Sequence, residues 1–310
     1  ATNPASALAF SAGLQGFIYG YPIVDMLKQK HNETHRVSAD QPVVGPANSI
    51  VAYPHILTPE TQGQLRAPNA DTLYINAWVD MSKGPVLLDV PEMGTRYYTL
   101  AFMDLYAKPH HLGTRTNGGR ATKYALIGPS GGDVPAGYEV FRMPTDTAWM
   151  LGRLLADGKA DEKRVLSIAK TFLMRGPVAT QVTAAAPMNP YASLAYFTLL
   201  NDALQVLPPL ADEAALMAVF DKAGFGPKAQ FSPDKLPPAQ ALGLNCAVRI
   251  GNDVLAKQGF KPTSVANRWM RNNRMDKPGH DYVLRAEAVR GGYVNAEEES
   301  IYTAAVMDNK

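Results

Sequence analysis

The segment RAPNADTLYINAWVDM, residues 66–81, places several chemically capable side chains at a regular spacing. Apolar residues alternate with Tyr74, Asn76, Trp78 and Asp80. This alternation predicts a strand with one apolar face and one polar, aromatic face. Aromatic, amide and carboxylate groups on one face indicate either an interdomain packing surface or the wall of a ligand pocket.

Three nearby residues have the chemistry of acid–base catalysts. They are Asp71, Asp104 and His110. Histidine suits proton transfer because its ordinary pKa is close to neutral. The alternative interpretation is structural: Asn69 and Asp71 form an Asx-type turn, and the neighbouring His110 and His111 lie exposed on a loop.

The residues expected to bind a substrate supply aromatic rings, an amide and guanidinium groups. Such groups line sites for small polar or aromatic ligands. We expect Arg96 and Tyr98, with Asp104, on strands beside residues 72–81. A buried Arg–Asp pair packed under aromatic rings is the structural alternative. The complete binding set is Asn69, Tyr74, Trp78, Arg96, Tyr98, Arg115 and Arg153.

No metal or cofactor is expected. His31 and His35 have the spacing that places two imidazoles on one helical face, but no third ligand follows at a recognisable spacing. The sequence also lacks a Gly-x-Ser-x-Gly elbow, a phosphate loop and a dinucleotide fingerprint. Cys246 is the only cysteine, which excludes an internal disulfide.

The bulk composition is that of a globular protein. The net charge of +2, without basic clusters, argues against nucleic-acid binding. No apolar run reaches the roughly 20 residues of a membrane span. The chain begins Ala-Thr-Asn-Pro, as it would after removal of a signal peptide. We therefore expect a soluble periplasmic or secreted protein.

The N-terminal half predicts a helix followed by a β-rich region. Asn3 and Pro4 are favourable at a helix start, and an apolar stripe continues from there to Tyr21 or as far as Lys30. Closely spaced strands joined by turn residues favour an antiparallel sandwich or open barrel over a parallel sheet. The expected strands are 49–54, 72–81, 85–90, 96–105, 121–128 and 137–143.

The C-terminal half predicts mainly helices. Thr145 or Thr147 could cap a helix on which Trp149 and Arg153 share one face. Further helices are expected around Val165–Phe172 and over 191–206, 211–223, 237–258 and 281–290. Residues 300–307 predict a strand without a partner. The fold class is therefore α+β, with domains at 1–42, 43–145, 146–268 and a connector at 269–310.

Several motifs resemble a bacterial family known as domain of unknown function 1254. The motifs are Tyr19-Gly20-Tyr21-Pro22, Pro68 to Tyr74, Trp78-Val79-Asp80, Arg96-Tyr97-Tyr98, Met103-Asp104 and Trp149 to Arg153. The segment from Asp281 to Tyr302 resembles the lead-in to a second domain, numbered 1214. The resemblance implies an exported protein with a further C-terminal β domain. That domain would be missing here, because the chain is a fragment or because cleavage after Lys310 makes it a separate chain.

Two functions remain open at this point. The first is a hydrolase or lyase that needs no nucleotide, with a small polar or aromatic ligand bound between β domains. The second is a non-catalytic envelope or ligand-binding protein. The expected partners are the C-terminal β domain and a small molecule, and a second copy of the chain is a further candidate.

Overall fold

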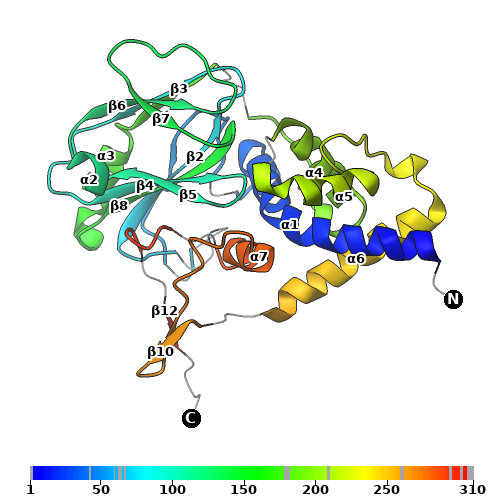
Figure 1. Ribbon diagram of the computed structural model, residues 1–310. Helices are drawn as coiled ribbons and strands as arrows, with labels where there is room; N and C mark the ends of the chain where they lie inside the picture. Colours follow the sequence, from blue (N-terminus) through cyan, green and yellow to red (C-terminus); the bar gives the residue numbers. More distant parts are fainter. Residues whose placement is uncertain are drawn as a thin grey trace. The chain divides into compact units, whose positions relative to one another are not determined.

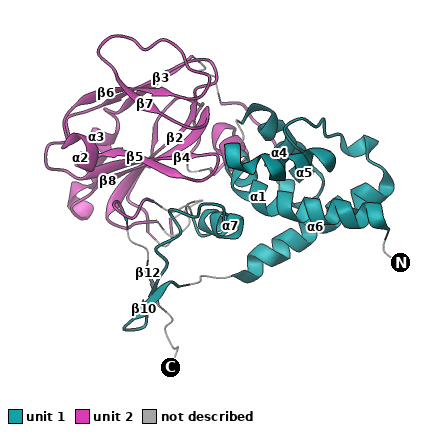
Figure 2. Cartoon of the chain, viewed as in Figure 1, with its two compact units in different colours: residues 1–28, 188–293, 300–310 teal, residues 29–187, 294–299 magenta. Residues whose placement is uncertain are grey.

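The computed structural model describes residues 3–41, 43–58, 60–61, 65, 68–177, 182–207, 210–258, 262–292, 295–300 and 303–305 (Figure 1). The chain divides into two compact units, shown in Figure 2. Unit 1 comprises residues 1–28, 188–293 and 300–310. Unit 2 comprises residues 29–187 and 294–299.

Helix α1, Pro4–Thr34, contributes to both units. The Asn3 carboxamide caps it by accepting a hydrogen bond from the backbone N–H of Ala5 at 2.9 Å. The helix continues through Pro22 and ends at Thr34. This agrees with the longer of the two expected helices, which extended to Lys30 and not only to Tyr21. Among the described residues, α1 is long and apolar enough to cross a membrane, and 61% of its most apolar stretch is buried in the protein. Core helices and signal sequences both meet that criterion.

Unit 2 contains two β-sheets. The five-stranded sheet is antiparallel throughout and has the order β1 (Val51–Ala52), β2 (Thr72–Asp80), β8 (Thr147–Leu155), β4 (Tyr98–Asp104) and β5 (Pro109–Gly113). The four-stranded sheet has the order β7 (Glu139–Arg142), β6 (Thr122–Ile127), β3 (Val86–Val90) and β9 (Leu173–Arg175). Its β6–β7 pair is parallel, which departs from the antiparallel pairing expected throughout.

The two sheets enclose one hydrophobic core. One face of β2 contributes Leu73 and Ile75, and β3 of the other sheet contributes Val86 and Leu88. Helix α3, Glu162–Ala169, buries Val165 in the same core. The β-rich region is therefore a sandwich, and the α+β fold class is confirmed.

The expected helix beginning at Thr145 or Thr147 is wrong, because residues 147–155 form strand β8. This strand lies between β2 and β4 and buries side chains on both faces. Central strands of this kind lose the polar alternation that identifies strands in a sequence. Pro109–Gly113, expected as a loop, is also a strand. The six strands expected between residues 49 and 143 are confirmed, with shorter bounds.

Unit 1 is mainly helical. Phe17 of α1 stacks on Tyr196 with ring centroids 4.4 Å apart. Gly251 of α6 lies so close to Phe17 that an added Cβ would be 2.3 Å from its ring, so glycine permits close helix packing here. The later predicted helices are confirmed as α4 (Ala195–Val206), α5 (Ala214–Lys222), α6 (Pro238–Gln258) and α7 (Tyr282–Arg290).

Unit 1 also contains a small antiparallel sheet of β10 (Ser264–Ala266), β11 (Trp269–Arg271) and β12 (Thr303–Ala305). Strand β12 is the described part of the strand expected over residues 300–307. It pairs with β11, so the expectation that it lacked a partner is wrong.

Candidate functional site

The five-stranded sheet has an outer face, which we define as the face opposite the sandwich core. Its register places Tyr74 beside Arg153 and Trp78 beside Trp149. The Arg153 guanidinium carbon lies 5.4 Å from the Tyr74 ring centre, and the two indoles stack with centroids 6.1 Å apart. Trp149 and Arg153 thus share a face, but as alternate residues of a strand. The same face carries Asn76, Asp80, Thr99, Ala101, Met103, His111, Thr147 and Leu151.

A buried carboxyl group from the end of α1 contacts one part of this face. Glu33 accepts hydrogen bonds from the Trp78 indole at 2.8 Å and from the Asn76 amide at 3.1 Å. Gln29 donates to its other oxygen at 2.9 Å. Trp149 extends the network by donating to the Asn76 oxygen at 2.6 Å. Burial raises the pKa of Glu33, because desolvation outweighs these stabilising hydrogen bonds.

An ion pair lies next to this network. Lys30 Nζ is 3.2 Å from the Asp80 carboxylate and 3.3 Å from the Thr147 hydroxyl. Burial acts to raise the pKa of Asp80, but Lys30 and hydrogen bonds from Ser82 outweigh it and hold this pKa below its ordinary value. The final turns of α1 are therefore fixed to β2 and β8 by polar contacts.

A second segment, which we call the strap, crosses another part of the outer face. The strap consists of residues 295–299. Its Asn295 side-chain oxygen accepts from Arg153 Nη1 at 2.9 Å, and its Ala296 N–H donates to His111 Nε2 at 3.2 Å. The Glu299 carboxylate accepts from the Tyr97 hydroxyl at 2.7 Å. All these residues belong to unit 2.

The Glu299 side chain is only 6% exposed, and Arg115 Nε lies 3.4 Å from its carboxylate. Burial raises the pKa of the Tyr97 hydroxyl, and its hydrogen bond to Glu299 raises it further. Burial lowers the pKa of His111 to about 4, with a further contribution from Arg153. His111 is therefore neutral at physiological pH, with a ring nitrogen that accepts a hydrogen bond.

Two expected catalytic residues lie away from this face. Asp104 and His110 are on the core-side face of β4 and β5, according to the strand register. His110 Nε2 is 3.0 Å from Asp104 Oδ2, while Asp104 Oδ1 accepts from the backbone N–H groups of Tyr106 and Lys108, each at 2.9 Å. These contacts fix the β4–β5 turn. Asp104 therefore lies on the sheet face opposite to that of Tyr74 and Trp78.

The other expected residues are dispersed. Asp71 is exposed. Asn69 instead contacts the outer face, since its backbone N–H lies 2.6 Å from the Tyr74 hydroxyl, which donates to its side chain at 3.0 Å. Arg96 makes a bidentate pair with Asp161 outside the face. Tyr98 points into the core, with its ring 5.9 Å from that of Phe172.

Of the expected binding residues, Tyr74, Trp78 and Arg153 lie together on the outer face. Arg115 joins them through its contact with Glu299. Sequence reasoning missed Glu33, Tyr97, His111 and the strap. Strand alternation would have placed His111 and His110 on opposite faces had Pro109–Gly113 been recognised as a strand. Glu33 and the strap have no local signal, because their contacts lie far away in the sequence.

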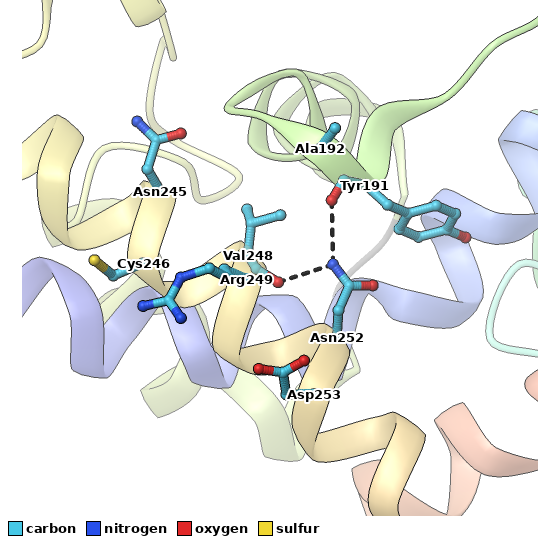
Figure 3. Close-up of a pocket in the computed structure, with 8 residues that line it drawn as sticks. All are labelled: Tyr191, Ala192, Asn245, Cys246, Val248, Arg249, Asn252 and Asp253. Carbon is cyan, nitrogen blue, oxygen red and sulfur yellow. Dashed lines mark hydrogen bonds between the residues drawn. The ribbon is translucent and has the colours of Figure 1, made fainter.

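A separate groove lies in unit 1 between α6 and the short 3-10 turn Pro190–Ala192. It has a volume of about 450 Å³. Figure 3 shows the Asn252 amide donating to the backbone oxygens of Tyr191 and Val248, at 3.1 and 2.9 Å. Its charged residues, Arg249 and Asp253, are exposed. Their contact with solvent makes the groove a weaker candidate than the outer face.

Comparisons with solved structures support the fold. The VPA0106 protein from Vibrio parahaemolyticus is similar with a TM-score of 0.64 and 20% identity, over 93% of this chain and 69% of that chain. An uncharacterised protein from Burkholderia cenocepacia has a TM-score of 0.29 and 17% identity, over 62% of this chain and 51% of that chain. The first likeness indicates a shared fold.

No curated protein matches the chain. Residues 47–176 match the sequence model of a family described as "Protein of unknown function (DUF1254)". These residues include every strand of the five-stranded sheet. The sandwich region at residues 47–176 is therefore similar to the DUF1254 family of unknown function.

Proposed function

We propose that the protein is a ligand-binding protein. It holds a small carboxylate-bearing molecule on the part of its outer face that the strap crosses. The observation that carries this proposal is the position of Glu299. Its carboxylate is almost fully buried between the Tyr97 hydroxyl and the Arg115 guanidinium. Two donors, one of them charged, are suited to recognising a carboxylate. Displacement of Glu299 would make these donors available to a ligand.

The neighbouring groups support a ligand that also has an unsaturated or aromatic part. Arg153 lies over Tyr74, and both belong to adjacent strands of the same face. Rings and guanidinium planes offer flat surfaces for such a group. We therefore propose a ligand that combines a carboxylate with a flat or polar body.

Calorimetric titration with benzoate, glutarate and N-acetylglutamate tests this function, with the uncharged amide of each acid as its control. The acids should bind and the amides should not. Arg115→Gln and Tyr97→Phe should each weaken binding by about tenfold or more, because each removes a donor to a charged group. Arg142→Gln, a change at an exposed arginine of the other sheet, should leave binding unchanged. Equal binding of acids and amides would contradict the proposal.

A hydrolase or lyase is the second candidate, and His111 is the observation that favours it. A neutral imidazole with an accepting nitrogen has the form required of a general base. Asp104 and His110, the earlier candidates, contact each other on the opposite sheet face. A screen of esters and amides tests this candidate. Turnover that is lost in His111→Gln and retained in His110→Gln would favour an enzyme over a binding protein.

Export to the periplasm remains part of the proposal. It is supported by the family resemblance of the chain's motifs. Fractionation of cells that express the complete gene would test it. Recovery of the protein only from the cytoplasm would exclude export.

A further inference from the structure

The strap places amide groups as well as a carboxylate against the outer face. Arg153 donates to a neutral amide oxygen, on Asn295. His111 accepts from a backbone N–H, on Ala296. The carboxylate of Glu299 is held separately by Tyr97 and Arg115, which lie beside the face. The outer face therefore satisfies an amide oxygen, an amide N–H and a carboxylate within one short segment. This segment turns between Ala296 and Glu299, where the Glu299 N–H donates to the Ala296 carbonyl at 2.9 Å.

The role of His111 depends on which ring nitrogen carries its proton. Nε2 faces the Ala296 N–H, so it must present its lone pair there. The proton then belongs on Nδ1, which is 3.2 Å from the Thr99 hydroxyl oxygen. An imidazole held in this form pairs with an N–H donor and leaves an ester oxygen without a partner. The ring of His111 is therefore suited to an amide N–H and not to an ester oxygen.

We propose that the outer face binds a peptide-like acid, and that the strap is an internal competitor for the same groups. This inference rests on the proposed function, because both concern the donors around Tyr97 and Arg115. The ligand class is a short molecule that can adopt a turn and carries an amide oxygen, an amide N–H and a carboxylate at one end. Acidic peptides meet this description, and the strap is itself an acidic peptide segment.

The composition of the strap suits a segment that can detach. Its sequence is Asn-Ala-Glu-Glu-Glu, so Ala296 is its only apolar residue. Its polar contacts would be exchanged for water on release, with little apolar surface exposed. The cation that pairs with Glu299 is Arg115, which is 57% exposed. Such a contact gives a modest barrier to exchange with a ligand of the same chemistry.

A capped synthetic pentapeptide, acetyl-Asn-Ala-Glu-Glu-Glu-amide, is the probe. Calorimetry should show that full-length Glu299→Gln binds it about tenfold or more tightly than the unsubstituted chain does, because the competing strap is weakened. Glu139→Gln removes the same charge at an exposed position of the other sheet and should behave like the unsubstituted chain. A pentapeptide ending in Gln should bind more weakly to all three proteins.

A second measurement does not depend on a variant. A glutamate-specific protease should cut the unsubstituted chain within the strap faster when the pentapeptide is present, because the displaced strap is accessible. If glutarate binds but the pentapeptide does not, the ligand class is overturned and the proposed function stands. If the pentapeptide binds equally to the unsubstituted chain and Glu299→Gln, and cleavage is unchanged, the competitor role is overturned. If no acid binds any of these proteins, the proposed function fails as well.

Discussion

Trp78 and Glu33 are joined by a hydrogen bond of 2.8 Å between the indole Nε1 and a carboxylate oxygen. Trp78 lies in strand β2, whereas Glu33 lies near the end of α1. Among the described residues, no cation is paired with this carboxylate, so three neutral donors satisfy it. These contacts explain how the carboxyl group of Glu33 is retained in the interior.

The first prediction concerns the donors that Glu33 satisfies. Glu33→Ala should lower the free energy of unfolding by about 2–5 kcal/mol, because it leaves the indole N–H of Trp78 and the amide of Asn76 without an acceptor in the interior. Urea denaturation followed by tryptophan fluorescence measures the change. Glu139→Ala, at an exposed site, should change stability by less than about 0.5 kcal/mol. Equal effects of the two substitutions would contradict the assigned network.

The second prediction is a pH dependence caused by Glu33. Because burial raises its pKa, the folded state holds the proton more tightly than the unfolded state. The stability from this proton is complete below the unfolded pKa of about 4.3 and decreases as pH rises through the folded pKa. Glu33→Gln should remove this decrease. Denaturation curves at a series of pH values test it, and parallel pH profiles for the two proteins would be the contrary result.

The sequence predicted the sandwich because most of its strands have a polar face and end at turns. It failed for β8, whose two faces are both buried, so its apolar residues follow no clear alternation. Trp149 and Arg153 are four residues apart. Residues at this spacing share one face whether the segment is a helix or a strand. Their grouping with Tyr74 was therefore correct, even though the secondary structure expected for them was wrong.

The site was predictable only where its residues lie on one strand. Tyr74 and Trp78 were identified from alternation within β2. Glu33 and Glu299 meet the sheet through long-range packing, which leaves no periodic signal in the sequence. Asp104 has the chemistry of a catalyst, but its carboxylate accepts hydrogen bonds from the backbone of the β4–β5 turn and fixes that turn.

The third prediction concerns His111, whose pKa is lowered to about 4 mainly by burial. The unfolded chain takes up a proton near pH 6.5, while the folded state resists it. Stability from neutral His111 is therefore complete above pH 6.5 and decreases by about 1.4 kcal/mol per unit as pH falls towards 4. His111→Gln should reduce this slope. His55→Gln is the matched control, since the His55 ring contacts the Ile56 carbonyl instead, and it should leave the slope intact.

The fourth prediction separates fold from function at Asp104. Asp104→Asn should lower the free energy of unfolding by about 1–3 kcal/mol, because it weakens charge-assisted contacts with His110 and the turn backbone. Carboxylate binding on the outer face should remain unchanged. Asp133→Asn, at an exposed position, should change neither quantity. Full stability combined with lost binding would return Asp104 to the functional site.

The fifth prediction tests the packing of β8 at Gly152. An added Cβ would lie 2.4 Å from Ile75 Cγ1 and 2.8 Å from Leu100 Cδ2, and both of these side chains are fully buried. Gly152→Ala should therefore lower the free energy of unfolding by about 1–3 kcal/mol through overpacking. Gly291→Ala, at the end of α7 with φ of −72°, has its nearest neighbour 3.3 Å away and should be tolerated. The denaturant midpoint measures both changes, and an unaltered midpoint for Gly152→Ala would mean that β8 does not lie between those two strands as described.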